Sequence, residues 1–297
     1  MIRYNPKTWF GQIFLFHRSD TLRILWQEML IMGIYSGILT WIITVNFPDH
    51  QHFKNTLSVH SLVGFVMGLF LVFRTNTAYD RWWEGRKLWG SLVNVSRNLS
   101  IKLNAFVKND SPEKKEIIQL LSFFPFAVKE HLRNQQQVSF DQFELSREIR
   151  EELIQADHLP NAIVQIIYGR LKEISKRQEI TAEEMLILDK ELSELLNIVG
   201  GCERIRSTPI PYSYSLFMKK FIFIYTVTIP IGLIPDFIYW TIPITMFIFY
   251  VMVSLEILAE EIEDPFGTDD NDLPTDEIAE KIALNIQEIE TKKRGSV

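Results

Sequence analysis

The sequence predicts an all-α integral membrane protein, and two observations support this fold class. Residues 29–48, 55–73 and 237–255 contain no Asp, Glu, Lys or Arg, and each is close to the ~20 residues that cross the hydrocarbon core of a bilayer as a helix. The rest of the chain shows helical apolar periodicity and helix-capping signals, with no competing strand pattern.

A fourth charge-free window, residues 221–235, is shorter than the other three. Lys219 and Lys220 precede it and Asp236 follows it, so charged heads can reach the interface while the segment stays in the membrane. We therefore predict four membrane spans. The alternative is four buried helices of a soluble core, which is disfavoured because the windows are apolar around their whole circumference.

Composition excludes several function classes. The net charge of −6 argues against nucleic-acid binding, and the single cysteine, Cys202, excludes an internal disulfide. The chain has no P-loop, GxGxxG, GxSxG or HExxH motif, so we expect no enzyme activity. The expected partners are membrane lipid, permeant ions and further copies of the chain.

Basic residues near the spans predict the topology. They precede the first span, follow the second and precede the third, whereas Lys54 is the only basic residue between spans one and two and the turn around 234–240 has none. The positive-inside rule therefore places both termini and the central segment in the cytoplasm. The predicted organisation is an N-terminal cytosolic segment (1–24), a transmembrane hairpin (25–84), a cytosolic helical domain (85–215), a second hairpin (216–258), and a cytosolic acidic turn with a C-terminal helix (259–297).

Several signals place helix ends in the cytosolic parts. Ser111-Pro112 is a helix start, and Thr181 with Glu184 forms a capping-box pattern. We expect Gly200-Gly201 to end the helix that Thr181 begins. A last amphipathic helix is expected at about 275–292.

The segment 61–90 carries the main functional signal. Phe65, Leu69 and Phe73 follow one another at i, i+4 and i+8 in an apolar helix that continues without a break into polar and charged sequence. A hydrophobic pore neck that opens onto an aqueous vestibule requires this pattern. The alternative interpretation is that the three side chains face lipid or the protein core.

The polar continuation contains two arginines, Arg74 and Arg81. They either face the vestibule and attract anions or pair with the nearby Asp80 and Glu84. The sequence favours pairing because opposite charges are abundant in this stretch.

Four sequence blocks resemble the bestrophin family, particularly its bacterial members. They are FR at 73–74, YDRWWEGRKLWG at 79–90, GGCERIRSTPIPYSY at 200–214 and AEEIEDPFGTDDNDLP at 259–274. The resemblance implies a homopentamer with four membrane helices and a helical cytosolic body in each subunit, around one axial pore lined by the second membrane helix. The family's neck of three apolar rings, which gates by dewetting, falls on Phe65, Leu69 and Phe73.

The resemblance also implies a second constriction at the cytosolic mouth. Counting back from Gly200 places it at Glu183, and a slip of one position would place it at Ala182 or Glu184. Five carboxylates in a ring would concentrate cations and repel anions, so the prediction leans towards monovalent cations, with an anion channel as the alternative. Glu183 can equally be a favourable acid in the first turn of a helix.

The acidic turn resembles the calcium-binding cluster of animal bestrophins. Asp269 and Asp272 stand where the family's carboxylate ligands stand, Asp264 replaces an amide-type ligand, and Glu261 lies one turn earlier. Calcium prefers about six to eight oxygen ligands. The alternative is a solvated acidic turn, and no cofactor is expected to be required.

Two other classes compete with a passive channel in the bacterial inner membrane. A secondary transporter would need ionisable groups at mid-membrane, and none of the charge-free windows supplies one. A non-conducting scaffold would not explain why the helix at 61–90 changes from apolar to polar sequence without a break. The sequence therefore predicts a channel.

Overall fold

The computed structural model describes residues 21–47, 55–107, 111–134 and 139–294. Every regular element within these ranges is helical, which confirms the predicted all-α fold. In chain order the helices are α2 (Thr21–Asn46), α3 (Thr56–Phe106), α4 (Pro112–Leu132), α5 (Arg147–Ile154), α6 (Leu159–Lys176), α7 (Ala182–Ser207), α8 (Tyr212–Phe237), the 3-10 helix η3 (Ile238–Trp240), α9 (Thr241–Glu263) and α10 (Thr275–Arg294).

The described chain divides into two compact units. The membrane unit holds the residues up to Arg81, Pro209–Asp264 and Asp269–Asn271. The body unit holds Trp82–Thr208, Pro265–Thr268 and the chain from Asp272 onward. Helix α3 is continuous: its residues up to Arg81 belong to the membrane unit and the others to the body unit.

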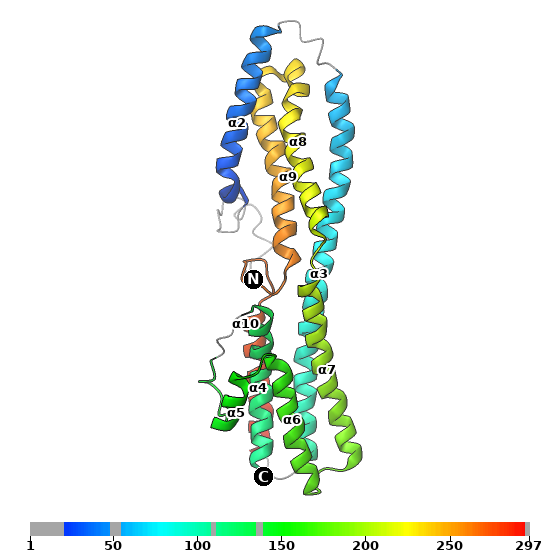
Figure 1. Ribbon diagram of the computed structural model, residues 1–297, viewed down its shortest axis with the longest axis vertical. Coiled ribbons are helices and arrows are strands. Elements are labelled where there is room, and N and C mark those ends of the chain that lie inside the picture. Colours follow the sequence, from blue (N-terminus) through cyan, green and yellow to red (C-terminus); the bar gives the residue numbers. More distant parts are fainter. Residues whose placement is uncertain (1–20, 48–54, 108–110, 135–138, 295–297) are drawn as a thin grey trace. The chain divides into compact units, whose positions relative to one another are not determined.

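The helices of the membrane unit are long and apolar enough to cross a bilayer. They are Thr21–Asn46, the helix Thr56–Phe106, whose residues up to Arg81 belong to this unit, and the stretch Tyr212–Glu263, which contains α8 and α9 on either side of η3. Helix α9 packs against both α2 and α8 (Figure 1). Only 22%, 11% and 28% of the most apolar windows are buried. The alternative of a soluble core is therefore wrong, because these surfaces need an apolar surrounding.

The body unit has its own extensive apolar core. Trp89, Phe123 and Phe124 are fully buried there, and α4 packs against α6, α7 and α10 (Figure 1). Cys202 belongs to the same core. Burial raises the pKa of its thiol to about 12, so the thiol stays protonated and unreactive at neutral pH.

The predicted capping box is present at the start of α7. The hydroxyl of Thr181 accepts a hydrogen bond from the Glu184 N–H at 3.2 Å, and the Glu184 carboxylate accepts one from the Thr181 N–H at 2.8 Å. The prediction that Gly200-Gly201 ends this helix is wrong, because α7 continues to Ser207. A Cβ on Gly201 would lie 2.9 Å from the Leu88 side chain, so glycine here allows a close approach between α7 and α3.

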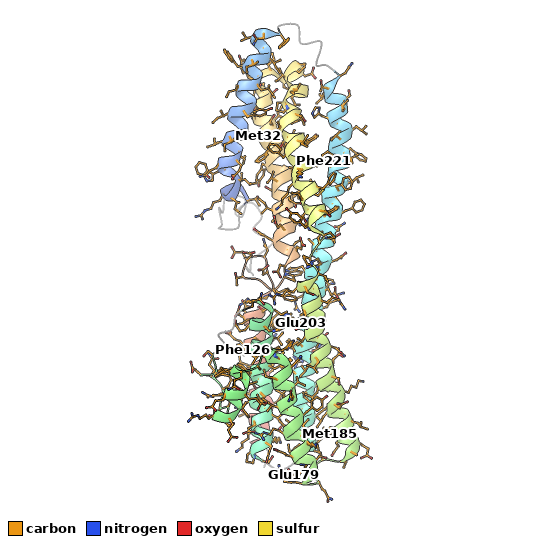
Figure 2. All side chains as sticks on the ribbon, in the orientation of Figure 1. Met32, Phe126, Glu179, Met185, Glu203 and Phe221 are labelled. Carbon is orange, nitrogen blue, oxygen red and sulfur yellow. The ribbon has the colours of Figure 1, made fainter. Side chains whose placement is uncertain are left out.

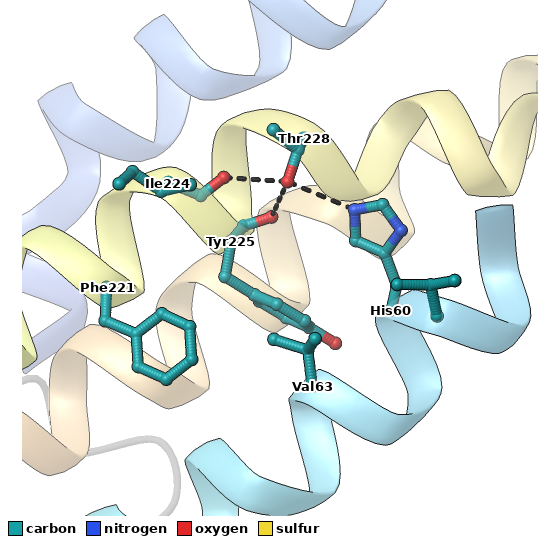
Figure 3. A pocket seen from close by; sticks show the side chains of 7 residues that line it. His60, Val63, Phe221, Ile224, Tyr225 and Thr228 are labelled. Atoms are coloured by element: carbon teal, nitrogen blue, oxygen red, sulfur yellow. Dashed lines mark hydrogen bonds between the residues drawn. The ribbon is translucent and has the colours of Figure 1, made fainter.

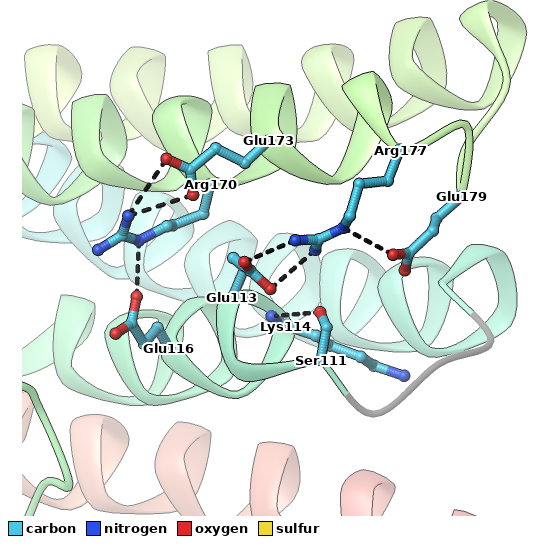
Figure 4. A network of polar contacts seen from close by, with 8 residues as sticks. All are labelled: Ser111, Glu113, Lys114, Glu116, Arg170, Glu173, Arg177 and Glu179. Atoms are coloured by element: carbon cyan, nitrogen blue, oxygen red, sulfur yellow. Dashed lines mark hydrogen bonds and ion pairs between the residues drawn. The ribbon is translucent and has the colours of Figure 1, made fainter.

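A network of ion pairs joins the first turns of α4 to the end of α6 (Figure 4). Arg177 binds both carboxylate oxygens of Glu113, at 2.7 and 2.8 Å, and also Glu179 at 2.8 Å. Arg170 contacts Glu116 at 2.6 Å. The pKa of Glu113 is lowered from its ordinary value of 4.5 to about 2. The largest cause is the hydrogen bonding from Arg177, and the second is a hydrogen bond from the backbone of Glu113 itself.

This shift predicts a pH-dependent contribution to stability. The folded-state pKa of Glu113 is depressed, so its contribution is complete above pH 4.5 and is lost as the pH falls towards about 2. We expect Glu113→Gln to lower the free energy of unfolding by less than about 1 kcal/mol at pH 7, because solvent screens an exposed pair. Thermal unfolding of the variant and its parent should differ at pH 7 and converge near pH 2. A difference that persists in acid would contradict this origin.

Candidate ion pathway

The neck stripe, defined as Phe65, Leu69 and Phe73, lies on the face of α3 opposite its packed face. Met67 and Leu71 are buried on that packed face, against residues of α8. At about 100° per residue, the stripe lies about 160–240° around the helix from Met67. Its side chains are 67%, 46% and 62% exposed. The predicted residues therefore share one free apolar face.

A pocket of about 270 Å³ lies between α3 and α8, on the packed side (Figure 3). The Nδ1–H of His60 donates to the Thr56 carbonyl at 2.8 Å, and its Nε2 lies 3.1 Å from the Thr228 hydroxyl. The lining residues are Val59, His60, Val63, Phe221, Ile224, Tyr225 and Thr228. None belongs to the neck stripe, so this pocket is separate from the face that the sequence assigns to the pore.

Arg74, directly after the stripe, is buried in an ion-pair cluster within the membrane unit. Its guanidinium lies 2.7 Å from the Glu263 carboxylate and 3.7 Å from that of Glu256. Glu263 also accepts hydrogen bonds from the Ile210 N–H at 2.7 Å and, at its carbonyl, from Arg81 at 3.0 Å. The prediction that Arg74 is paired is confirmed, but its expected partners are wrong, because the acids come from α9.

The side chains exposed on the free face of α3 change from apolar to polar after the stripe. Asn76 and Asp80 are exposed in the membrane unit, and Lys87, Asn94 and Asn98 are exposed in the body unit. Glu84 pairs with Arg204 at 2.5 Å. The apolar stripe is thus followed along α3 by exposed amide and charged groups.

Glu183 lies in the first turn of α7 with its side chain exposed. Its neighbour Glu184, not Glu183, completes the capping box. One turn further along α7, Leu186 is 70% exposed and Ile187 is 42% exposed. Sequence reasoning missed these apolar side chains, although the run Met-Leu-Ile-Leu at 185–188 contains more apolar residues than one buried helical face needs.

The acidic turn follows α9 directly. Asp264 is the C-cap of α9, and the Glu261 carboxylate accepts a hydrogen bond from the Asn271 amide at 2.6 Å. Asp269 belongs to the membrane unit with these residues, and Asp272 is a buried residue of the body unit. Carboxylates of this kind suit calcium chemically. The amide of Asn271 occupies only one of the two carboxylate oxygens of Glu261, so the other oxygen can still serve as a ligand.

One cluster of potential metal ligands has no signal in the sequence. His131, His158 and Glu203 come from three different helices or their caps, and their ligand atoms all lie within 4.8 Å of one another. No local spacing connects these positions, so only the packing of α4, α6 and α7 brings them together.

Comparison with known proteins gives one consistent family. Residues 1–288 match the family described as Bacterial/Fungal Bestrophin protein. The chain is 32% identical over 287 residues to the voltage-dependent anion channel-forming protein YneE of Escherichia coli K12, covering 96% of this chain and 93% of that one. A protein of Synechocystis with the same description is 32% identical over 273 residues, covering 89% of each chain.

Comparison with solved structures points to the same family. A crystal structure of a bacterial bestrophin homologue from Klebsiella pneumoniae superposes with a TM-score of 0.82 at 27% identity, covering 89% of this chain and 98% of that one. The family match spans nearly the whole chain, and the predicted resemblance is confirmed. The chain belongs to the bestrophin family, a family of ion channels and not of enzymes.

Proposed function

We propose that five copies of this chain form a channel that conducts ions passively through a pore lined by α3. The observation that carries the proposal is the neck stripe: three exposed apolar side chains at helical spacing, opposite the packed face, followed by exposed polar residues. Repeated around a five-fold axis, they form apolar rings that close by dewetting.

We further propose that the channel conducts anions. The sequence-based lean towards cations depends on Glu183 alone, and the comparisons do not support it, since the relatives are named anion channel-forming proteins. Lys87, Asn94 and Asn98 are exposed on α3. Ammonium and amide N–H groups are hydrogen-bond donors suited to anions. A cation channel is the second candidate, favoured by the exposed Glu183 carboxylate.

The proposed setting is the bacterial inner membrane, with both termini in the cytoplasm. The distribution of basic residues supports this orientation. If the channel uses calcium, the carboxylates of the membrane unit that would bind it are Glu261, Asp264 and Asp269. Conduction itself requires no cofactor.

The reversal potential of the purified protein in a planar bilayer tests this function. Under a tenfold KCl gradient we expect reversal near the chloride equilibrium potential, about 59 mV from zero for a perfectly selective pore. Reversal near the potassium potential would overturn the anion assignment and support a Glu183 ring. No current from protein verified as inserted would overturn the channel itself.

Glu183→Gln separates the two selectivities further. In an anion channel whose exit Glu183 does not line, this variant should reverse at the same potential as the parent. Glu152→Gln, an exposed acid on α5, makes the same charge change elsewhere and is the matched control. A shift towards chloride in Glu183→Gln alone would place Glu183 in the pore.

A further inference from the structure

Two histidines and one glutamate converge in the body unit. His131 lies in the last turn of α4, and His158 is the N-cap of α6. Glu203 lies on α7, where Figure 2 labels it. One carboxylate oxygen of Glu203 is 2.6 Å from Nε2 of His131 and 2.7 Å from Nε2 of His158. The two imidazole rings are 4.3 Å apart between centroids.

The cluster has two features of a preformed ligand site: its side chains are partly exposed, and its backbone positions are fixed. The side chains are 22%, 33% and 35% exposed, so they are held by their surroundings yet reachable from solvent. Helices α4, α6 and α7 pack against one another, which fixes the backbone positions of all three residues. The proposed ion pathway uses none of them.

We propose that Nε2 of His131, Nε2 of His158 and the Glu203 carboxylate bind one zinc ion. Two imidazoles and a carboxylate form a ligand set that zinc uses in proteins, with water completing the tetrahedron where the site is open. Calcium and magnesium prefer oxygen ligands, so the two nitrogens select against them. The partial exposure of the three side chains leaves room for the water ligand.

Zinc requires a small rearrangement of the observed geometry. Ligand atoms around a tetrahedral zinc lie about 3.3 Å apart, whereas the hydrogen-bonded pairs here lie 2.6 and 2.7 Å apart. Rotation of the side chains can separate the ligand atoms to this distance, and each atom moves by less than about 1 Å. The zinc–nitrogen and zinc–oxygen bonds are then each about 2 Å long.

The protons must also be redistributed. Nδ1 of His158 accepts a hydrogen bond from the Asn161 N–H at 3.2 Å, so without metal the Nε2 of a neutral ring carries the proton and donates to Glu203. Zinc takes the Nε2 lone pair, so that proton leaves and Nδ1 gains one. Zinc binding therefore breaks the His158 cap, which weakens the affinity but does not block it.

The charged side chains near the cluster still allow a cation to bind. Arg204 is paired with Glu84 at 2.5 Å. Arg206 donates to the backbone carbonyl of His131 at 3.0 Å, and its positive charge opposes a bound cation. The Glu203 carboxylate is therefore essential, because it supplies negative charge at the site itself.

The test uses the full-length protein, purified in detergent and freed of metal. Titration with zinc against a chromophoric chelator should show one zinc per chain, and the unfolding temperature should rise with zinc but not with magnesium. His131→Gln, His158→Asn and Glu203→Gln should each weaken zinc binding by more than about 100-fold, since even the outer hydrogen-bond partners of a metal site contribute about 10–100-fold. Asparagine is chosen at His158 because it still caps a helix.

Matched controls separate this site from adventitious binding. Glu130→Gln and His60→Gln remove a carboxylate and an imidazole outside the cluster and should leave the zinc affinity unchanged. Retention of the parent's oligomeric size shows that a variant has folded. The proposal is overturned if the parent binds no zinc, if the three cluster variants bind as tightly as the parent, or if the controls lose as much affinity as they do.

Discussion

Replacing Phe65, Leu69 and Phe73 together by alanine should raise the macroscopic current through the channel at least about tenfold. A dry apolar neck blocks ions because water does not fill it, and smaller side chains widen and hydrate the rings. The stripe faces away from the packed side of α3, so truncating it should leave the contacts of Met67 and Leu71 with α8 intact.

The size of this effect follows from the apolar area removed. A tenfold change in rate corresponds to about 1.4 kcal/mol. Burying a single Leu or Phe side chain involves about 1.5–3 kcal/mol, and each proposed ring contains five such side chains. Tenfold is therefore a lower bound, provided that the neck limits conduction.

The measurement is the current per inserted channel in planar bilayers, together with the fraction of time that the channel is open. Phe223→Ala on α8 and Phe247→Ala on α9 are matched controls, because both phenylalanines are about as exposed as Phe65, at 65% and 64%. Their currents should equal that of the parent. An unchanged current in the triple variant, or an equal increase in the controls, would remove the stripe from the pore.

Local signals were sufficient to predict the fold class and the position of the stripe. Charge-free windows and a repeat of four residues depend only on the sequence within one helix, so Phe65, Leu69 and Phe73 could be placed on one face in advance. The Thr181–Glu184 capping box was likewise predictable, because both partners lie within one turn.

Features that depend on contacts between helices were not predictable. Gly201 resembles a helix end in the sequence, but it lies against Leu88 inside a continuous helix. The partners of Arg74 lie about 180 residues away along the chain, and nearer acids were wrongly preferred. The cluster around Glu203 is the extreme case, since three helices each contribute one residue.

Replacing Arg74 by methionine should destabilise the protein by about 3–5 kcal/mol, because it leaves buried carboxylates without their countercharge. Arg74 is 1% exposed as a side chain, and Glu256 and Glu263 are 4% and 13% exposed. Methionine keeps most of the arginine stem's volume, so the loss reports charge more than packing. Thermal unfolding in detergent and the yield of intact oligomer measure it.

A double variant distinguishes charge pairing from a simple packing defect at this site. Arg74→Met with Glu256→Met removes a buried positive and a buried negative charge together, and replacing both members of such a pair is often close to neutral. Glu263 is kept because it also holds the Ile210 N–H. We therefore expect the double variant to recover part of the lost stability, while Arg97→Met, an exposed arginine on α3, behaves as the parent. If the double variant is less stable than Arg74→Met alone, Arg74 stabilises the protein through the packing of its side chain and not by neutralising the carboxylates of α9.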